Sequence, residues 1–359
     1  MIEILKNLIT IPSISGDHEK SAKLFEYIKK ELLGLDLFFT DCNSNNFKSL
    51  LITTKETKSP TIWLVAHIDV VPGKEDLFKA KVIDNKLYGR GAYDMKFAAA
   101  AYIATFKELG QKVKDLNVGI MFTSDEEVAG YDGVGYILKQ GYSSDIAFLP
   151  DGGTEWKFEK MSKGVFQYRV ISYGASAHSS RPWQGKNAIM QLSAFLTKLE
   201  KNFPKEPCGD ENHVHNSINT GMIIGGKAVN QIPDIAEATI DIRFLPMWSE
   251  EKIVAMLEKA KPKDADIIFE RIDFVSSFST NIDNKYLATF YEIAKEKYGI
   301  LQEAIISHGS SDARFFGEKN IPVILTRPIG GGHHSDEEWI SVSDLERFKE
   351  VLKIFIQKI

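Results

Sequence analysis

The stretch Thr61-Ile-Trp-Leu-Val-Ala-His67-Ile-Asp69 decides the fold class of this 359-residue chain. Its short, continuous apolar run is typical of a strand that is buried on both faces of a parallel sheet. The run ends in an imidazole and a carboxylate. Three further apolar runs lead to similar residues, at Asp125-Glu126-Glu127, at Asp151 and, beyond a glycine run, at His333-His334. We therefore predict four strands that deliver metal-type ligands at their carboxyl ends.

Ligands of open α/β sheets bind beyond the carboxyl ends of the strands. Four separate regions of the chain would therefore converge on one crevice. Histidine and carboxylate together form the donor set of zinc and similar divalent metals. Cysteine cannot build such a site here, because the chain contains only Cys42 and Cys208, far apart in the sequence. We expect both to be reduced thiols.

The sequence pattern changes twice along the chain. Helix and strand alternate up to Asp151, which indicates an α/β domain with a mainly parallel sheet flanked by helices. From about Val165 the pattern is that of a smaller α+β unit, and the first pattern returns after about Phe278. We expect one domain formed by residues 1–164 and 278–359, with residues 165–277 inserted in it.

Composition and charge exclude several classes of partner. The net charge is −5 and no dense Lys/Arg run is present, so we expect no nucleic-acid partner. Charged residues interrupt the amphipathic N-terminal segment, which argues against a signal peptide. No stretch has the length of a bilayer span, and we expect a cytoplasmic protein without membrane attachment. The motifs of a phosphate-binding loop and of a serine nucleophile elbow are both missing.

Each candidate residue also has an ordinary structural interpretation. His67 and Asp69 share one face of a strand end, but His-x-Asp alone more often marks a core or surface histidine. Asp94 precedes an alanine-rich helix, where an aspartate commonly caps the free N–H groups. The acids Asp125-Glu126-Glu127 are also typical of a solvated helix start. Asp151 stands before two glycines, as many turn residues do.

Taken together, the ordered segments strongly resemble the co-catalytic metallopeptidase and deacylase family. This family includes aminoacylase, acetylornithine deacetylase, succinyl-diaminopimelate desuccinylase, glutamate carboxypeptidase and several di- and tripeptidases. The resemblance covers nearly the whole chain. It is carried chiefly by the stretches Ala66-His-Ile-Asp-Val-Val-Pro72, Gly89-Arg-Gly-Ala-Tyr-Asp-Met-Lys96, Thr123-Ser-Asp-Glu-Glu127, Pro150-Asp151, His308-Gly-Ser-Ser-Asp-Ala-Arg-Phe315 and His334-Ser-Asp-Glu-Glu-Trp339.

The resemblance implies two divalent metal ions that share the carboxylate of Asp94. Zn²⁺ is the expected metal, with Co²⁺ and Mn²⁺ as alternatives. Two ions carry four positive charges and the three implied carboxylates carry three negative ones, so a bridging hydroxide would neutralise the cluster. His334 is preferred to His333 because its spacing to Glu338 matches the family. The implied ligands are His67, Asp94 and Asp151 for one ion, and Asp94, Glu127 and His334 for the other.

The other implied roles concern proton transfer and substrate contacts. Glu126 would be the general base, and Asp69 would orient the nearby metal-binding histidine. In the inserted segment, His178 resembles a histidine that, in dimeric members, reaches the partner subunit's site and stabilises the oxyanion. Asn230 and Arg243 resemble residues that contact a substrate carboxylate. The inserted domain is therefore expected to act as a lid and to pair with its copy in a homodimer.

The implied activity is zinc-dependent hydrolysis of an amide bond by metal-bound hydroxide. The product is an amino acid, released from an N-acyl amino acid or a short peptide. We prefer a deacylase or carboxypeptidase-like enzyme, of the succinyl-diaminopimelate desuccinylase or acetylornithine deacetylase type. An aminopeptidase or dipeptidase is the alternative, and Asp151 favours it, because deacylase relatives often carry Glu there. A metal-containing binding protein without turnover is the rival from another class. Glu126 and His178 argue against that rival, because binding alone requires neither.

Overall fold

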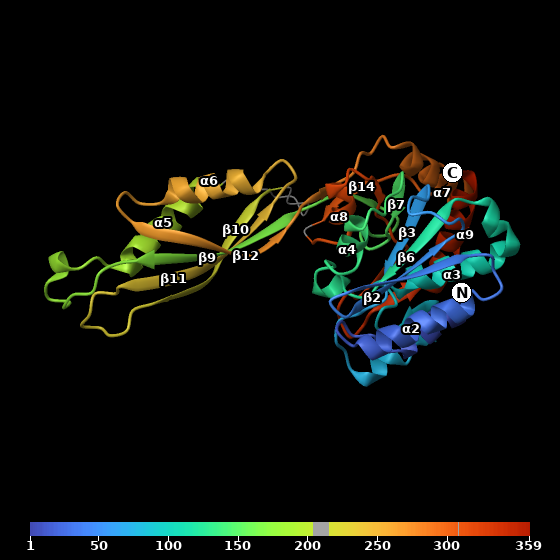
Figure 1. Cartoon of the computed structure of the whole chain (residues 1–359), viewed down its shortest axis with the longest axis horizontal. Helices are drawn as coiled ribbons and strands as arrows, with labels where there is room; N and C mark the ends of the chain where they lie inside the picture. Colours follow the sequence, from blue (N-terminus) through green and yellow to red (C-terminus); the bar gives the residue numbers. More distant parts are fainter. Residues whose placement is uncertain (204–214, 308) are drawn as a thin grey trace. The chain divides into compact units, whose positions relative to one another are not determined.

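The structure is a computed structural model that describes residues 1–203, 215–307 and 309–359, and Figure 1 shows its helices and strands. His308, the first residue of one of the family-like stretches, lies outside the described residues. Within the described ranges, no helix combines the length and the apolar character that crossing a lipid bilayer requires.

The chain forms two compact units. It passes from the first unit to the second after Lys160 and returns to the first after Ser279. The first unit therefore contains both ends of the chain, and the second is chiefly one continuous insertion. The division that we predicted, after residues 164 and 277, lies within a few residues of these positions.

The first unit is built around a six-stranded sheet. Its strands are β1 (Phe38–Ser44), β2 (Phe47–Thr53), β3 (Ile62–His67), β6 (Val118–Thr123), β7 (Ile146–Phe148) and β15 (Val323–Ile324). Their order is β1-β2-β6-β3-β7-β15. β3 pairs in parallel with β6 and β7, and β15 pairs in parallel with β7, whereas β2 is antiparallel to both of its neighbours. The predicted α/β class with a mainly parallel sheet is confirmed.

The central strands bring the candidate ligands to one edge of this sheet. Every residue of β3 and β6 is buried, as their continuous apolar sequence predicts. His67 is the last residue of β3 and pairs with Thr123, the last residue of β6. Asp151 follows β7, which lies on the other side of β3. The parallel register therefore places three ligand-bearing loops side by side.

Helices surround this sheet in the first unit (Figure 1). α3 is almost wholly buried, and it packs against α1, α9 and β3. Its run Ala98–Ala101 combines high helix propensity with small side chains. The helices are α1 (Ile2–Thr10), α2 (His18–Glu31), α3 (Lys96–Leu109), α4 (Val134–Lys139), α7 (Lys285–Tyr298), α8 (Ala313–Glu318) and α9 (Val342–Lys358).

A smaller antiparallel sheet in the first unit places two further loops. Its strands are β4 (Lys81–Ile83), β5 (Lys86–Tyr88), β16 (Gly330–Gly331) and β17 (Trp339–Ser341), in the order β16-β17-β5-β4. β16 and β17 pair with each other, and the loop between them carries His333 and His334. β17 also pairs with β5, from which the chain continues to Asp94 and α3. Two ligand-bearing loops therefore leave neighbouring strands.

The second unit is a four-stranded antiparallel sheet with helices on one face (Figure 1). Its elements are β9 (Gly164–Tyr173), α5 (Ala188–Asn202), β10 (Ser217–Gly225), β11 (Ile235–Phe244), α6 (Glu250–Ala260) and β12 (Asp266–Val275), with the strand order β10-β11-β9-β12. Alternate residues of β11 are buried and pack with α5 and α6 in one apolar core. This period of two is typical of a sheet covered on one face.

Short elements complete the described chain. They are the 3₁₀ turns η1 (Glu75–Phe78), η2 (Gly110–Asp115), η3 (Glu126–Val128) and η4 (Pro182–Gln184), and the strands β8 (Phe158–Ser162), β13 (Phe278–Ser279) and β14 (Ala304–Ser307).

Candidate metal centre

His67 lies at the end of β3 with its ring among carboxylates. Its side chain is 1% exposed, and Nε2 lies 3.3 Å from Asp94 Oδ1 and 3.7 Å from Asp151 Oδ1. Nδ1 lies 3.0 Å from the backbone oxygen of Asp69 and 3.5 Å from that residue's Oδ1. Burial alone would lower the pKa of His67, but the carboxylates of Asp151, Asp69 and Asp94 outweigh it and raise that pKa well above its usual value. This strongly negative environment favours a cation.

Asp94 stands between His67 and the two histidines of the β16–β17 hairpin. Its Oδ2 lies 2.6 Å from Nε2 of His333 and 3.0 Å from Nε2 of His334. Nε2 of His334 is also 3.1 Å from Glu127 Oε2. Burial would raise the pKa of Asp94, but the adjacent His333, His334 and His67 hold it well below its usual range. One oxygen faces His67 and the other faces the hairpin, an arrangement that suits a carboxylate shared by two cations.

The ligand atoms gather into two neighbouring groups, and within each group all of them lie within 4.8 Å of one another. Imidazole nitrogen and carboxylate oxygen in sets of three fit zinc and related divalent ions. The residues present therefore suit two ions. The groups are Asp94 with His333 and His334, and His67 with Glu126 and Asp151.

Glu126 and Glu127 form the turn η3 directly after β6, and the carboxylate of Asp69 fixes their backbone. Asp69 accepts hydrogen bonds from the N–H groups of Glu126 at 3.3 Å and Glu127 at 3.2 Å, and from Ser15 Oγ at 2.7 Å. Burial raises the pKa of the Glu126 carboxyl well above its usual range, and the carboxylate of Asp151 adds to this effect. A carboxyl group with a raised pKa is suited to both accepting and donating a proton near neutrality.

Asp151 is the second carboxylate beside His67, and its environment is mixed. Burial raises the pKa of the Asp151 carboxyl, and His67 and Arg327 partly offset this effect. Arg327 also donates from Nε to the backbone oxygen of Gly153 at 3.0 Å. A cation beside Asp151 would stabilise its ionised form in the same way.

Seven of the ten predicted site residues lie together in the first unit, and three lie in the second. In the second unit, His178 is exposed, and its Nδ1 lies 3.2 Å from the backbone N–H of Ser180. Because that N–H can only donate, Nδ1 is the acceptor, and a neutral ring carries its proton on Nε2. The predicted residues of the second unit are His178, Asn230 and Arg243.

Asn230 lies in the loop that precedes β11, and Arg243 lies near the end of that strand. Asn230 is next to His178, because its backbone oxygen accepts from the N–H of Ser179 at 3.0 Å. Arg243 is near the far end of the strand, where its Nε and Nη2 donate to Asp241 at 2.7 and 3.1 Å. The eight residue steps from Ile235 to Arg243 span about 26 Å of extended strand. The strand therefore separates Arg243 from the loop that carries Asn230 within one copy.

Sequence reasoning did not assign a role to three residues that contact this cluster. His333 was set aside in favour of its neighbour, although both contact Asp94. Glu338 served only as a spacing marker, although its carboxylate accepts from the backbone N–H of Asp94 at 3.0 Å. Ser15 had no local signal, because it lies far from Asp69 in the sequence. Of these three contacts, only that of His333 had a signal in the sequence, namely its position next to His334.

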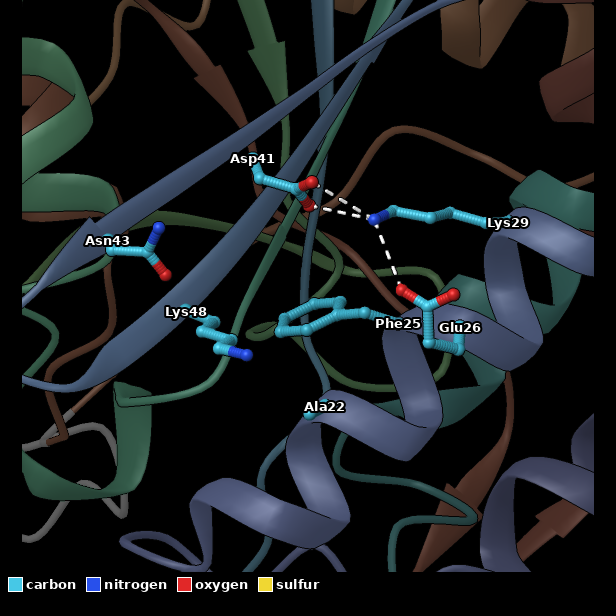
Figure 2. Close-up of a pocket in the computed structure, with 7 residues that line it drawn as sticks. All are labelled: Ala22, Phe25, Glu26, Lys29, Asp41, Asn43 and Lys48. Carbon is cyan, nitrogen blue, oxygen red and sulfur yellow. Dashed lines mark hydrogen bonds and ion pairs between the residues drawn. The ribbon is translucent and has the colours of Figure 1, made fainter.

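A separate pocket of about 170 Å³ lies between α2 and the strands β1 and β2 (Figure 2). Phe25 lies beside it, and Lys29 pairs with Asp41 at 3.0 Å and with Glu26 at 3.2 Å. These charges are matched within the pocket wall, and none of the predicted site residues lines it. We assign it no part in the chemistry.

Known proteins resemble this chain in sequence and in fold. The model of "Peptidase family M20/M25/M40" matches residues 63–358. Succinyl-diaminopimelate desuccinylase of Rickettsia akari is 28% identical over 386 residues, which cover 100% of this chain and 99% of the relative. The enzyme of the same name from Wolinella succinogenes is 25% identical, with 98% of each chain covered.

Solved structures share the fold over nearly the full length. The aminopeptidase PepT from Bacillus cereus has a TM-score of 0.78 at 19% identity, with 99% of this chain and 97% of that chain covered. The YXEP protein of Bacillus subtilis, described as a dinuclear metal binding peptidase, has a TM-score of 0.70 at 18% identity, with 100% and 98% covered. The family match spans most of the chain and includes every predicted site residue. The chain therefore belongs to peptidase family M20/M25/M40 and is a hydrolase of amide bonds.

Proposed function

We propose that the protein is a two-zinc deacylase that releases an amino acid from an N-acyl amino acid, with Co²⁺ or Mn²⁺ as alternative metals. The observation that carries the proposal is the position of Asp94, whose two carboxylate oxygens face His67 and the hairpin histidines respectively. A carboxylate placed in this way can hold two ions close together, as in other two-metal hydrolases. The dinuclear peptidase with the same fold supports this reading.

The proposed ligands divide between two ions. His67 and Asp151 would hold the first ion, His334 and Glu127 would hold the second, and Asp94 would bridge them. We prefer His334 to His333 because His334 reaches both Asp94 and Glu127. When bound, such ions polarise the substrate carbonyl and lower the pKa of a water molecule.

Two side chains of the first unit would serve proton transfer: one accepts and donates the proton, and the other holds that first side chain in position. Glu126 would accept a proton from the attacking water and pass it to the leaving nitrogen. Its position next to Asp151 and His67 suits this role, and burial raises the pKa of its carboxyl group. Asp69 would keep Glu126 and Glu127 in register through their backbone N–H groups.

The second unit would supply the oxyanion donor and part of the substrate contacts, in a homodimer. The Nε2–H of His178, left as the ring proton by the contact with Ser180, is a suitable donor to a developing oxyanion. Asn230 lies before the start of β11 and Arg243 lies near its end, and the strand from Ile235 to Arg243 alone spans about 26 Å. A substrate that contacts both residues would therefore take them from different copies. This separation supports a dimer in which the second unit acts as a lid.

The choice between a deacylase and a peptidase is tested by substrate. The curated relatives named above are desuccinylases, which favours N-acyl amino acids. An aminopeptidase or dipeptidase is the second candidate, because an aminopeptidase shares the fold and because Asp151 is the ligand type of such enzymes in the resemblance. N-succinyl and N-acetyl amino acids and free di- and tripeptides should be compared with Zn²⁺, Co²⁺ and Mn²⁺ added in turn.

We expect the highest kcat/KM on N-acyl amino acids. Peptides with a free N-terminus that are cleaved faster would overturn the deacylase assignment and leave the two-metal hydrolase intact. Metal binding with no hydrolysis of either class would favour a binding protein without turnover.

The metal assignment predicts two ions per chain. It also predicts that replacing His333 and replacing His334 change the number of bound ions differently. The wild-type protein should bind two Zn²⁺ ions, and His334→Ala should bind one, because it removes the ligand shared with Glu127. His333→Ala is the matched control and should still bind two. Elemental analysis and anomalous scattering from metal-loaded crystals would measure this. One ion in the wild type, or loss of an ion in the His333 variant alone, would contradict the assignment.

A further inference from the structure

A buried ion pair lies directly behind the candidate metal centre. Nη1 of Arg90 lies 2.9 Å from Oε2 of Glu338, and the two side chains are only 3% and 1% exposed. Glu338 lies between the hairpin histidines and β17, and Arg90 lies between β5 and Asp94. The pair therefore joins the two loops that carry ligands of the proposed second ion.

The carboxylate of Glu338 accepts from four groups, all of them on the loop that leads to Asp94. Oε2 accepts from Arg90 Nη1 and from the N–H of Gly91 at 3.0 Å. Oε1 accepts from the N–H of Tyr93 at 2.8 Å and from the N–H of Asp94 at 3.0 Å. Charge-assisted bonds of this kind are about twice as strong as neutral ones. Glu338 thus fixes the backbone from which the Asp94 carboxylate projects.

Arg90 extends the contact to the other two loops. Its Nη2 lies 3.5 Å from the backbone oxygen of His334 and 3.5 Å from that of Pro72. These distances are at the outer limit of hydrogen bonding, so each contact alone is weak. Pro72 belongs to the loop that follows His67 and Asp69. The guanidinium of one residue on the Asp94 loop therefore touches the backbone of two other loops that carry candidate ligands.

The pair could serve only to hold the two loops together or only to stabilise the fold, but both explanations are weaker than a functional one. The strands β5 and β17 already hold these loops together by backbone pairing. Burying an ion pair removes both charges from water, and this loss of hydration makes the pair a weak source of net stability. What this pair adds is a fixed position for the backbone of Asp94 and His334. Residues that fix metal ligands in this way commonly change metal affinity when they are replaced.

We propose that Arg90 and Glu338 form a positioning pair that sets the separation of Asp94 and His334 and thereby determines the affinity for the second ion. This inference rests on the two-ion site of the proposed function. The pair does not touch substrate, and it acts only through the loops that it holds.

The test is the affinity of Glu338→Gln for two ions, measured by calorimetry with Zn²⁺ and by the absorption spectrum during titration with Co²⁺. The amide keeps the shape of the side chain but has one oxygen, so its NH₂ group must face two of the donors. We expect the second ion, two of whose ligands depend on the pair, to bind about 10–100-fold more weakly. The first ion shares only the Asp94 ligand with this network, so its affinity should fall clearly less. Excess metal should restore kcat. Arg90→Lys keeps the positive charge but loses the planar guanidinium and its several N–H donors. This variant should also bind the second ion more weakly.

The matched control is Asp344→Asn, which changes another buried carboxylate of the first unit. Asp344 accepts from the indole N–H of Trp156 at 2.8 Å and from the N–H of Ile329 at 2.7 Å. This variant should lose stability and keep both metal affinities. Equal weakening of both ions in all three variants would show general destabilisation and overturn the proposal, as would wild-type affinity in Glu338→Gln. If Glu338→Gln fails to fold, Arg90→Lys decides by the same criterion. Fewer than two ions in the wild type would instead reject the proposed function.

Discussion

Glu126→Gln should lower kcat by about 10²–10⁴-fold, the usual contribution of general acid–base catalysis, while both metal ions remain bound. The amide has nearly the same size and shape as the carboxyl group but cannot accept the proton of the attacking water. This test can separate the two roles, because the carboxylate of Glu126 lies close enough to the ligand atoms of His67 and Asp151 to bind a metal ion with them. If Glu126 were a ligand, its replacement would remove an ion as well as the activity.

The measurement is kcat on the best substrate together with the metal content of the same sample. Glu127→Gln is the matched control at the neighbouring position. It should lose the second ion, because Glu127 Oε2 lies 3.1 Å from His334 Nε2. A fully active Glu126→Gln, or one that holds a single ion, would show that the two adjacent glutamates have been assigned the wrong roles.

His178→Ala should lower kcat by about 10²–10³-fold, the typical effect of removing one oxyanion donor. If the proposed dimer places His178 in the partner subunit's site, activity should return when His178→Ala and Glu126→Gln proteins exchange subunits. In each mixed dimer, one site combines an intact Glu126 with an intact His178 from the other copy. Equal mixing makes half of the dimers mixed, so about a quarter of wild-type activity should return.

The matched control is a mixture of Glu126→Gln with Glu127→Gln. Both changes lie in the same unit, so no mixed dimer contains an intact site and no activity should return. Subunit exchange is followed separately with differently tagged copies. Exchange without recovery in the first mixture would place His178 in its own copy's site or outside the reaction. A protein that is monomeric in solution would also rule out action in the partner site, and the two-metal assignment would stand.

The elements that sequence predicted well are those with a strong local pattern. The buried strand that ends at His67 and the helix Lys96–Leu109 both carry a continuous apolar or alanine-rich signal. The second unit was visible in the change to an α+β pattern from about Val165, within the strand Gly164–Tyr173. Such periodicities arise from the geometry of a single strand or helix, so they are readable without knowledge of the partner.

The cluster around the predicted ligands depended on contacts that no local pattern contains. Asp69 was expected to orient His67, yet its carboxylate also bonds to the backbone of Glu126 and Glu127. His333 was set aside, yet the hairpin brings it as close to Asp94 as its neighbour. These details depend on loop conformation, which spacing along the chain does not specify.

By itself, the sequence determined the succession of strands, helices and ligand types along the chain. The spacing of apolar residues and the chemistry of each side chain are local properties, so they can be read without the fold. Only the tertiary structure decided which loops meet. The pairing of β5 with β17 brings Glu338 onto the backbone of Asp94 across more than 240 residues of sequence. The length of β11 separates Asn230 from Arg243. Contacts of this kind follow from the packing of whole elements against one another, and the chain specifies that packing only as a complete fold.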